Sequence, residues 1–506
     1  MSDGNSGSGG VKNRETFASR MGFIFIAAGC AIGLGNIWRF PYITGQYGGA
    51  AFVLIYLIFL AVLVMPIMAM EFAVGRASKL TVIRSFNALE PEGSKWHVFG
   101  YFGFAANVLL MMFYTVVTGW MIAYFWYNIS GQLAGLSPDE VGGFFGGLVS
   151  NPQALIAWLV LAIVLGSAIC YKSLQASVEP ITKYMMSGLL VIMVILAVRS
   201  VTLPGAGAGL EFYLKPDFGK LMGEDGRGLG AAIYAALGQA FFTLSVGIGS
   251  MAVFGSYINR DRSLFGEAAT VTLLDTSVAI CAGLIIFPAC FAYGVDVGAG
   301  PGLIFVSLPV MFNNMATMGQ FWGSLFFLFM TFAAMSTVVA VFENIIAGLR
   351  DVFPGWSRQK ATIVNAVGVF VLALPCVFGF NLWSDFAPLG EGTIVLDLED
   401  FILSNNLLPI GATIYLMFCT YRYGWGWDNF IKEADAGAGI KFPKVLRGFF
   451  TYVAPIIIFV VFVVGYYDLH FKNIPSVVPV IWLIAGVLVT FILTASMVSQ
   501  KKSLKQ

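Results

Sequence analysis

The sequence has few charged residues for its length. Asp, Glu, Lys and Arg make up 11% of the 506 residues, whereas hydrophobic residues make up 58%. Soluble chains carry roughly a quarter of charged residues, so this composition excludes that class. The formal net charge of +1 also argues against nucleic acid as a partner, because nucleic-acid binding requires a basic surface. The composition predicts an integral membrane protein that lies in the lipid bilayer.

Histidine is nearly absent, and cysteines in short-spaced pairs are lacking. The chain has two histidines, His97 and His470, and six cysteines that all lie inside apolar runs. This pattern excludes a disulfide framework and a zinc site, and no nucleophile cluster is visible, so we do not expect an enzyme. A stretch typical of a cleavable signal peptide is also lacking. We interpret residues 1–19, rich in Gly and Ser at their start, as a cytoplasmic tail.

Long apolar runs dominate the rest of the chain. A membrane-spanning helix needs about 20 mostly apolar residues, and lipid offers no partner for an open backbone. We therefore predict an all-α integral membrane protein with about twelve transmembrane helices. The predicted spans lie near residues 20–45, 50–72, 98–127, 153–171, 179–200, 230–257, 268–294, 319–349, 361–380, 398–421, 449–467 and 476–498.

The charges of the loops indicate the orientation. Lys and Arg gather in the N-terminal tail, after the second span and after the tenth span, whereas the stretch Asn381–Asp400 has acidic residues but no Lys or Arg. Short cytoplasmic loops carry an excess of Lys and Arg. We therefore predict a multi-pass protein of the cell membrane with both termini in the cytoplasm.

Two of the predicted spans are interrupted by glycines and small polar residues. The first is interrupted at Gly29–Asn36 and the sixth at Thr243–Ser250. Glycines alone could simply allow close helix packing, but matched breaks five spans apart favour an inverted-repeat transporter site. We predict a first repeat at 20–200 (helices 1–5), a second repeat at 230–421 (helices 6–10), helices 11 and 12 at 449–498, and a second cytoplasmic tail at 499–506.

A broken helix offers both surfaces that a zwitterion needs. Free N–H groups at a half-helix N-terminus hold a carboxylate, and free carbonyl groups suit a hard cation such as sodium. The break Ala31–Asn36 provides both. Ionisable side chains at membrane depth are functional candidates by default. They are Arg39, Glu71, Asp275, Glu343 and Asp400, of which Glu71 is expected to brace the broken helices and Glu343 has no assigned role.

Two motifs carry a resemblance to a known family. The segment Gly33–Pro41 is similar to the first-helix signature of the neurotransmitter:sodium symporters, and Gln239–Ser245 resembles the sixth-helix motif of the same family. The resemblance extends from about Arg14 to the end of the eleventh span. It implies the fold of the bacterial leucine transporter, with two inverted five-helix repeats.

The resemblance implies two sodium sites. The first would use the Ala31 carbonyl, Asn36, Thr243, Asp275 and the carboxylate of the substrate. The second would use the carbonyls of Gly29, Ile32 and Ala333 with the hydroxyls of Ser336 and Thr337. Sodium bound to the substrate would make co-transport a direct contact with reciprocal coupling.

The resemblance also implies a substrate site. Its residues would be Cys30, Ala31, Leu34, Gly35, Leu110, Tyr114, Phe242, Thr243, Ser245, Ile248, Thr337 and Val341. The monoamine branch carries an aspartate at the position of Gly33, so its absence favours a ligand that brings its own carboxylate. An apolar lining favours a neutral side chain, because an unpaired charge there is costly.

Two gates and one substitution follow from the same comparison. Arg39 and Asp400 would pair outside the site, and Arg14 would pair with Asp351 on the inside. Chloride-dependent members bind the anion with Tyr, Gln, Ser and Asn side chains. Tyr56 and Gln239 match that set, but Asp275 and Ala279 stand in two of its positions. We expect the Asp275 carboxylate to replace chloride and make transport chloride-independent.

These observations predict a sodium-coupled symporter that imports a small neutral amino acid by alternating access. A membrane sensor that binds an amino acid without transporting it is the alternative, although neither terminus is long enough for a signalling domain. A channel would need a continuous lined pore, which the paired gates oppose. Uptake against a gradient separates the symporter from the other classes.

Overall fold

The structure is a computed structural model that describes residues 17–222, 228–294, 302–315, 318–466 and 484. Within these residues the secondary structure is helical, apart from one isolated bridge between Arg262 and Ala438. Arg14 and the predicted twelfth span, apart from Ile484, lie outside the described residues.

The described chain contains nine helical segments that are long and apolar enough to cross a membrane, and one bent pair that passes the same test together. The bent pair consists of α1 (Arg20–Ala31) and the segment Gly35–Gln46, formed by η1 (Gly35–Arg39) and α2 (Phe40–Gln46). The nine segments are Ala50–Ser78, His97–Ile129, Pro152–Cys170, Leu174–Val201, Leu264–Tyr293, Gly319–Val352, Arg358–Gly379, Val395–Thr420 and Lys444–Val463.

The nine spans, together with the two shorter helices α12 and α13 on either side of the second break, contain the following elements. They are α3 (Ala50–Phe59), η2 (Leu60–Val64), α4 (Met65–Ser78), α6 (His97–Ile129), α8 (Pro152–Cys170), η3 (Leu174–Val178), α9 (Glu179–Val201), α12 (Leu229–Thr243), α13 (Ser250–Ser256), α14 (Leu264–Tyr293), α16 (Gly319–Val352), α17 (Arg358–Gly379), α18 (Val395–Asp400), η6 (Phe401–Leu407), α19 (Leu408–Thr420), η7 (Lys444–Leu446), η8 (Phe449–Val453) and α21 (Ala454–Tyr466).

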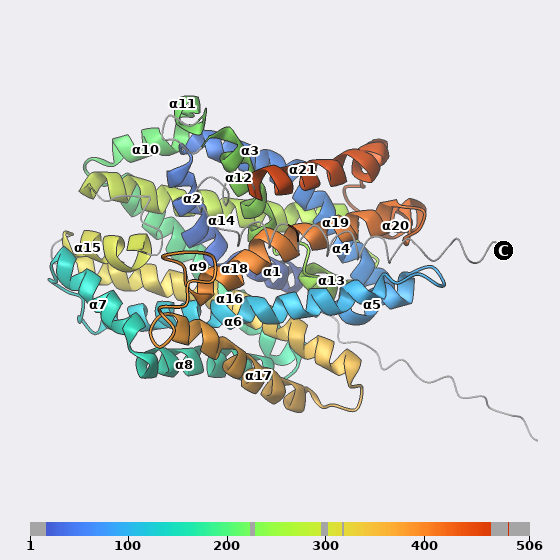
Figure 1. Ribbon diagram of the computed structural model, residues 1–506, viewed down its shortest axis with the longest axis horizontal. Helices are drawn as coiled ribbons and strands as arrows, with labels where there is room; N and C mark the ends of the chain where they lie inside the picture. Colours follow the sequence, from blue (N-terminus) through green and yellow to red (C-terminus); the bar gives the residue numbers. More distant parts are fainter. Residues whose placement is uncertain (1–16, 223–227, 295–301, 316–317, 467–483, 485–506) are drawn as a thin grey trace, which may run out of the picture.

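The short helices gather at the two ends of the bundle. Figure 1 shows α7 (Pro138–Ser150), α10 (Ala206–Leu214), α11 (Phe218–Met222) and α15 (Leu308–Asn313) at one end. The helices α5 (Val82–Leu89) and α20 (Trp427–Ala434) lie at the other end. Following the loop charges, we name the first the outer end and the second the inner end.

Both predicted breaks are present. The helix α1 ends at Ala31, and the chain resumes at Gly35 with a bend of 52°. The second break separates α12 from α13 over residues 244–249, where Ser245, Gly247 and Gly249 have positive φ. Gly247 is required there for a second reason, because a Cβ atom would lie 2.1 Å from the Leu408 carbonyl oxygen. The two breaks therefore rest on local backbone conformation and on close approach of a neighbouring helix.

The helices α6 and α16 form the centre of the bundle and pack along one another. Most of their length is buried. The helix α1, which ends at the first break, packs against α16. The two breaks lie beside this pair in the middle of the molecule, which places their free backbone groups away from both ends.

Candidate functional site

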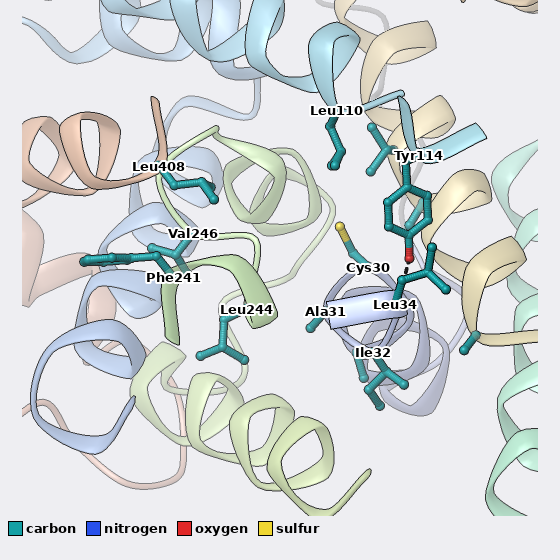
Figure 2. Close-up of a cluster of buried hydrophobic side chains, with 14 of the residues drawn as sticks. Cys30, Ala31, Ile32, Leu34, Leu110, Tyr114, Phe241, Leu244, Val246 and Leu408 are labelled. Carbon is teal, nitrogen blue, oxygen red and sulfur yellow. Dashed lines mark hydrogen bonds between the residues drawn. The ribbon is translucent and has the colours of Figure 1, made fainter. Parts of the chain in front are cut away.

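A cavity lies between the two breaks. It is a small cavity of about 20 Å³, lined by Cys30, Ala31, Gly33, Gly35, Leu110, Tyr114, Phe242, Ser245, Ile248, Thr337, Leu403 and Leu408. Figure 2 shows Leu110 and Tyr114 of α6 reaching toward Cys30 and Leu34 of the first break, with Leu408 on the far side. The lining is mostly apolar, with polar groups confined to the broken segments, Tyr114 and Thr337.

Most of the expected substrate residues line this cavity, but three do not. Leu34 donates its backbone N–H to the Tyr114 hydroxyl, and Thr243 faces Asp275. Val341 is buried in α16 and is not among the lining residues. Leu403 and Leu408 take part in the lining instead, and sequence analysis missed both, because a leucine in an apolar span carries no signal for a site.

The backbone groups of the first break have side-chain partners from other helices. The N–H of Leu34 meets the Tyr114 hydroxyl oxygen at 2.9 Å, and the Cys30 carbonyl accepts from the Ser245 hydroxyl at 3.2 Å. The carbonyl of Gly35 accepts from the Gln239 side chain at 2.8 Å. Buried backbone groups require such partners, so the break is a defined conformation rather than a frayed end.

The residues expected at the first sodium site form one buried cluster. The Asn36 amide nitrogen lies 2.8 Å from an Asp275 carboxylate oxygen, and its amide oxygen accepts from the Gly33 N–H at 3.1 Å. The Thr243 hydroxyl donates to Asp275 at 3.1 Å. The Ala31 residue lines the adjoining cavity. The cluster brings a carboxylate, an amide and a hydroxyl together, and the Asn36 amide connects it to Gly33, which lines the cavity.

The residues that match the chloride-binding set surround the same carboxylate region. Tyr56, Gln239 and Ala279 are buried. Among the described residues, the Tyr56 hydroxyl and the Gln239 amide oxygen have no hydrogen-bond partner. Asp275 is thus the acidic group of a pocket whose other side chains are neutral.

The five groups expected at the second sodium site converge. The Thr337 hydroxyl oxygen lies 3.1 Å from the Gly29 carbonyl oxygen and 3.4 Å from that of Ile32. The Ser336 hydroxyl oxygen lies 3.4 Å from the Ile32 carbonyl oxygen and 2.8 Å from that of Ala333. The five oxygens are thus linked by short contacts between α1 and α16.

Both clusters fit a hard monovalent cation. Their donors are carbonyl, hydroxyl, amide and carboxylate oxygens, which hard cations prefer. The described residues contain no group of three or more His, Cys, Asp or Glu side chains that could hold a transition metal. Freed carbonyls at unwound helices are the usual ligands of sodium in transporters with broken helices.

Charged side chains lie between the cavity residue Phe242 and α18. The Arg39 guanidinium lies 3.7 Å from the Asp400 carboxylate and 2.9 Å from the Ser404 hydroxyl, which in turn donates to Asp400 at 2.6 Å. The same guanidinium lies 4.6 Å above the centre of the Phe242 ring. The structure therefore brings together the expected outer pair and adds Ser404, a residue that sequence analysis missed although it stands one turn after Asp400.

At the inner end, Asp351 and Glu343 both have hydrogen-bond partners, and the expected pair of Arg14 with Asp351 stays a prediction. Asp351 accepts from the Thr81 N–H at 2.7 Å, while its expected partner Arg14 lies outside the described residues. Glu343, which had no role, receives two hydrogen bonds from Arg358 and one from the Tyr257 hydroxyl at 3.2 Å. The interaction is buried and links the end of α13 to α16 and α17.

Glu71 contacts the second break as expected for a brace. Its carboxylate accepts from the Gly247 N–H and faces the backbone of Gly249 and Met251 at the start of α13. An acidic group at a helix N-terminus is stabilised by the free N–H groups and the dipole of the helix. The break in the sixth span is therefore held by the carboxyl group of Glu71 from α4.

Comparison with known proteins identifies the family. The model of the sodium:neurotransmitter symporter family matches residues 14–138 and 148–503. The chain belongs to this family. The symporter is 33% identical over 452 residues to an uncharacterized sodium-dependent transporter, YhdH, of Bacillus subtilis, which covers 88% of this chain and 96% of the relative. An uncharacterized sodium-dependent transporter of Haemophilus influenzae is 32% identical over 465 residues, covering 89% and 98%.

A solved structure extends the likeness to three dimensions. The crystal structure of MhsT in complex with L-phenylalanine is 38% identical to the symporter, with a TM-score of 0.80, and covers 89% of this chain and 100% of that chain. These matches confirm the family and the all-α membrane fold expected from the two motifs. They also confirm that the symporter is a transporter rather than an enzyme, with sodium as its coupling ion.

Proposed function

We propose that the symporter carries a small neutral amino acid into the cell together with sodium, without a requirement for chloride. The observation that carries this proposal is the apolar cavity bounded by two broken helices, whose lining residue Gly33 is hydrogen-bonded to the buried cluster of Asn36, Thr243 and Asp275. The L-phenylalanine bound by MhsT supports a neutral amino acid as ligand. The amino acid would contact the residues that line the cavity.

In this proposal the first break supplies the site for the carboxylate of the ligand. Gly35 and Leu34 provide N–H groups, and Tyr114 stands at hydrogen-bond distance of Leu34. The carboxylate would also complete the ligands of the first sodium ion. Cys30, Leu110, Ile248, Leu403 and Leu408 provide an apolar surface for the side chain, which disfavours a charged side chain because none of these groups could pair with it.

The proposal also assigns the direction of transport and the gates. With both termini in the cytoplasm, the layer of Arg39, Ser404 and Asp400 closes the outer side, and the network at Asp351 and Glu343 closes the inner side. Alternating access requires these two closures to open in turn around a fixed site.

Uptake into proteoliposomes tests the proposal. Neutral, acidic and basic amino acids are offered one at a time, with and without an inward sodium gradient. We expect accumulation of at least one neutral amino acid above its outside concentration, only with the gradient. Sodium-dependent binding without accumulation would support the sensor instead, and accumulation of acidic or basic amino acids alone would contradict the assignment of a neutral ligand.

Thr337 belongs to the proposed second sodium site, so replacing it should change the sodium dependence of uptake. The variant Thr337→Val keeps the shape of the side chain but removes the hydroxyl that lies near the Gly29 and Ile32 carbonyls. We expect the sodium concentration for half-maximal uptake to rise about tenfold, because the ion loses one buried ligand. Thr331→Val is the control, because Thr331 lies on the same helix and donates only to its own helix at Phe327. Equal sodium dependence in both variants would remove Thr337 from the site.

The place of Asp275 predicts that transport does not depend on chloride. Its carboxylate lies beside the proposed sodium ligands Asn36 and Thr243, and a nearby cation holds a carboxylate in its charged form. Uptake should therefore be unchanged when gluconate replaces chloride. In Asp275→Asn, whose shape is nearly the same, we expect uptake to fall about 100-fold in gluconate. Strict chloride dependence of the unaltered symporter would refute the assignment.

A further inference from the structure

Asn107 lies directly beneath the cavity, one turn of α6 from Leu110. Its side chain is 2% exposed. The amide nitrogen donates to the carbonyl of Gly103 at 2.8 Å and to that of Ile248 at 2.9 Å. The amide oxygen accepts from the Ser250 hydroxyl at 2.8 Å and lies 3.4 Å from the Asn344 amide nitrogen. Both donors and both acceptor positions of this side chain are thus in use.

The partners of Asn107 belong to the inner half of the second break. Ile248 lines the cavity, and Ser250 is the first residue of α13. The Ile248 carbonyl lies outside both half-helices, so the helical hydrogen-bond pattern does not satisfy it, and Asn107 supplies a donor from another helix. The side-chain amide of Asn107 therefore holds both Ile248, which lines the cavity, and Ser250, where α13 begins.

Close packing makes this contact specific. A Cβ atom on Gly103 would lie 3.1 Å from the Ile248 carbonyl oxygen, and one on Gly249 would lie 2.3 Å from Val82 Cγ2. The two glycines allow α6 and the start of α5 to approach the break to within direct contact. Such an approach leaves no space for water between the amide of Asn107 and its two partners on the broken helix.

Asn107 also lies on the boundary between two groups of helices. Its own helix α6 packs along α16, which contributes Asn344, seven residues beyond the proposed sodium ligand Thr337. Glu71 of α4 holds the opposite side of the same break at Gly247. The inner half-helix is thus tied to α4 by a carboxylate and to the α6–α16 pair by an amide.

We propose that Asn107 is a positioning residue that fastens the inner half-helix α13 to the α6–α16 pair, and thereby holds the inner side of the site closed with Ile248 in place. This inference rests on the proposed alternating-access function and extends it. When the inner side opens, water can replace the amide at the Ile248 carbonyl and the Ser250 hydroxyl. Removing the amide therefore penalises the closed state, in which these two groups stay buried without a partner, more than the open state.

Sided labelling of Cys30 tests this assignment. Membrane vesicles of both orientations are treated with a membrane-impermeant maleimide in sodium medium without added amino acid. Modification of Cys30 is then measured by mass spectrometry of its peptide, which separates it from the other cysteines. We expect Asn107→Ala to raise the labelling rate from the inner face about tenfold, with no rise from the outer face.

Three further variants sharpen the test. Asn107→Asp keeps the size and the acceptor for Ser250 but places an oxygen against the Ile248 carbonyl, so it should behave like the alanine variant. Ser250→Ala removes one partner only, and we expect a rise of about threefold. Asn128→Ala is the matched control. Asn128 is a buried asparagine of α6 that donates to its own helix at Tyr124, away from the break.

The outcomes separate this inference from the proposed function. Unchanged inner-face labelling in Asn107→Ala, an equal rise from both faces, or the same rise in Asn128→Ala would overturn it. If Asn107→Ala does not fold, Ser250→Ala and Asn344→Ala decide in the same way. The assay needs no transported ligand, so a failure of every amino acid in the uptake panel would refute the proposed function and still leave the labelling result meaningful.

Discussion

Sodium-driven uptake should fall about 100-fold when Gly33 is replaced by alanine. A Cβ atom at this position would lie 2.2 Å from the Tyr114 hydroxyl oxygen and 2.5 Å from the Thr337 hydroxyl oxygen. The first group is bonded to the Leu34 N–H in the proposed carboxylate site, and the second lies among the proposed ligands of the second sodium site. One methyl group thus displaces side chains of two sites at once.

The matched control is Gly368→Ala in α17, where a Cβ atom would meet nothing within 4 Å. Both variants add one methyl group to an apolar span, and only the first adds it next to the cavity. Uptake and sodium dependence are measured for both after confirming equal amounts of folded protein. Near-normal uptake by Gly33→Ala would show that the space around this position is not part of the binding geometry.

The same close contacts bear on the kind of ligand. An aspartate at position 33, as in the monoamine branch of the family, would require Tyr114 and Thr337 to move from the places they occupy here. Because position 33 is a glycine in this symporter, it offers no acidic side chain to a ligand amine. The geometry agrees with the argument from the sequence that the ligand brings its own carboxylate to the break.

The sequence was sufficient where a short motif holds the information. Both breaks, with Asn36 and Thr243, lie in segments whose glycines and polar residues stand out inside apolar spans, whereas Asp275 was grouped with them only by the family resemblance. A glycine-rich interruption signals a broken helix because the backbone groups it frees must find other partners. The fold followed from the same two interruptions, since their spacing indicates repeated halves.

Residues whose role depends on contacts between distant spans could not be found this way. Asn107 stands alone in an apolar run, and its partners Ile248 and Ser250 lie more than 140 positions away. Ser404 was also missed, although its place beside Asp400 could have been predicted, because a residue four positions later on a helix shares the same face. Which residues of distant spans touch one another depends on how the spans pack, and a single sequence without its relatives does not reveal that packing.

Removal of the Arg358 side chain should destabilise the symporter strongly. Its guanidinium is bonded to both oxygens of Glu343, and its Nε donates to the Cys170 carbonyl at 2.8 Å. Both side chains of the pair are almost entirely buried. Loss of one partner of a buried ion pair costs about 3–5 kcal/mol, because the other charge stays buried without compensation. We expect Arg358→Met to lower the apparent melting temperature by roughly 3–5 °C.

Two comparisons test whether the unpaired charge is the cause. Lys215→Met breaks the exposed Lys215–Glu211 pair and should leave the melting temperature unchanged, because exposed pairs contribute little. The double variant Glu343→Gln with Arg358→Met removes both charges and should regain most of the lost stability. If the double variant is as unstable as Arg358→Met, packing of the arginine rather than its charge holds α16 and α17 together, and Glu343 would then serve chiefly as the acceptor for the Tyr257 hydroxyl at the end of α13.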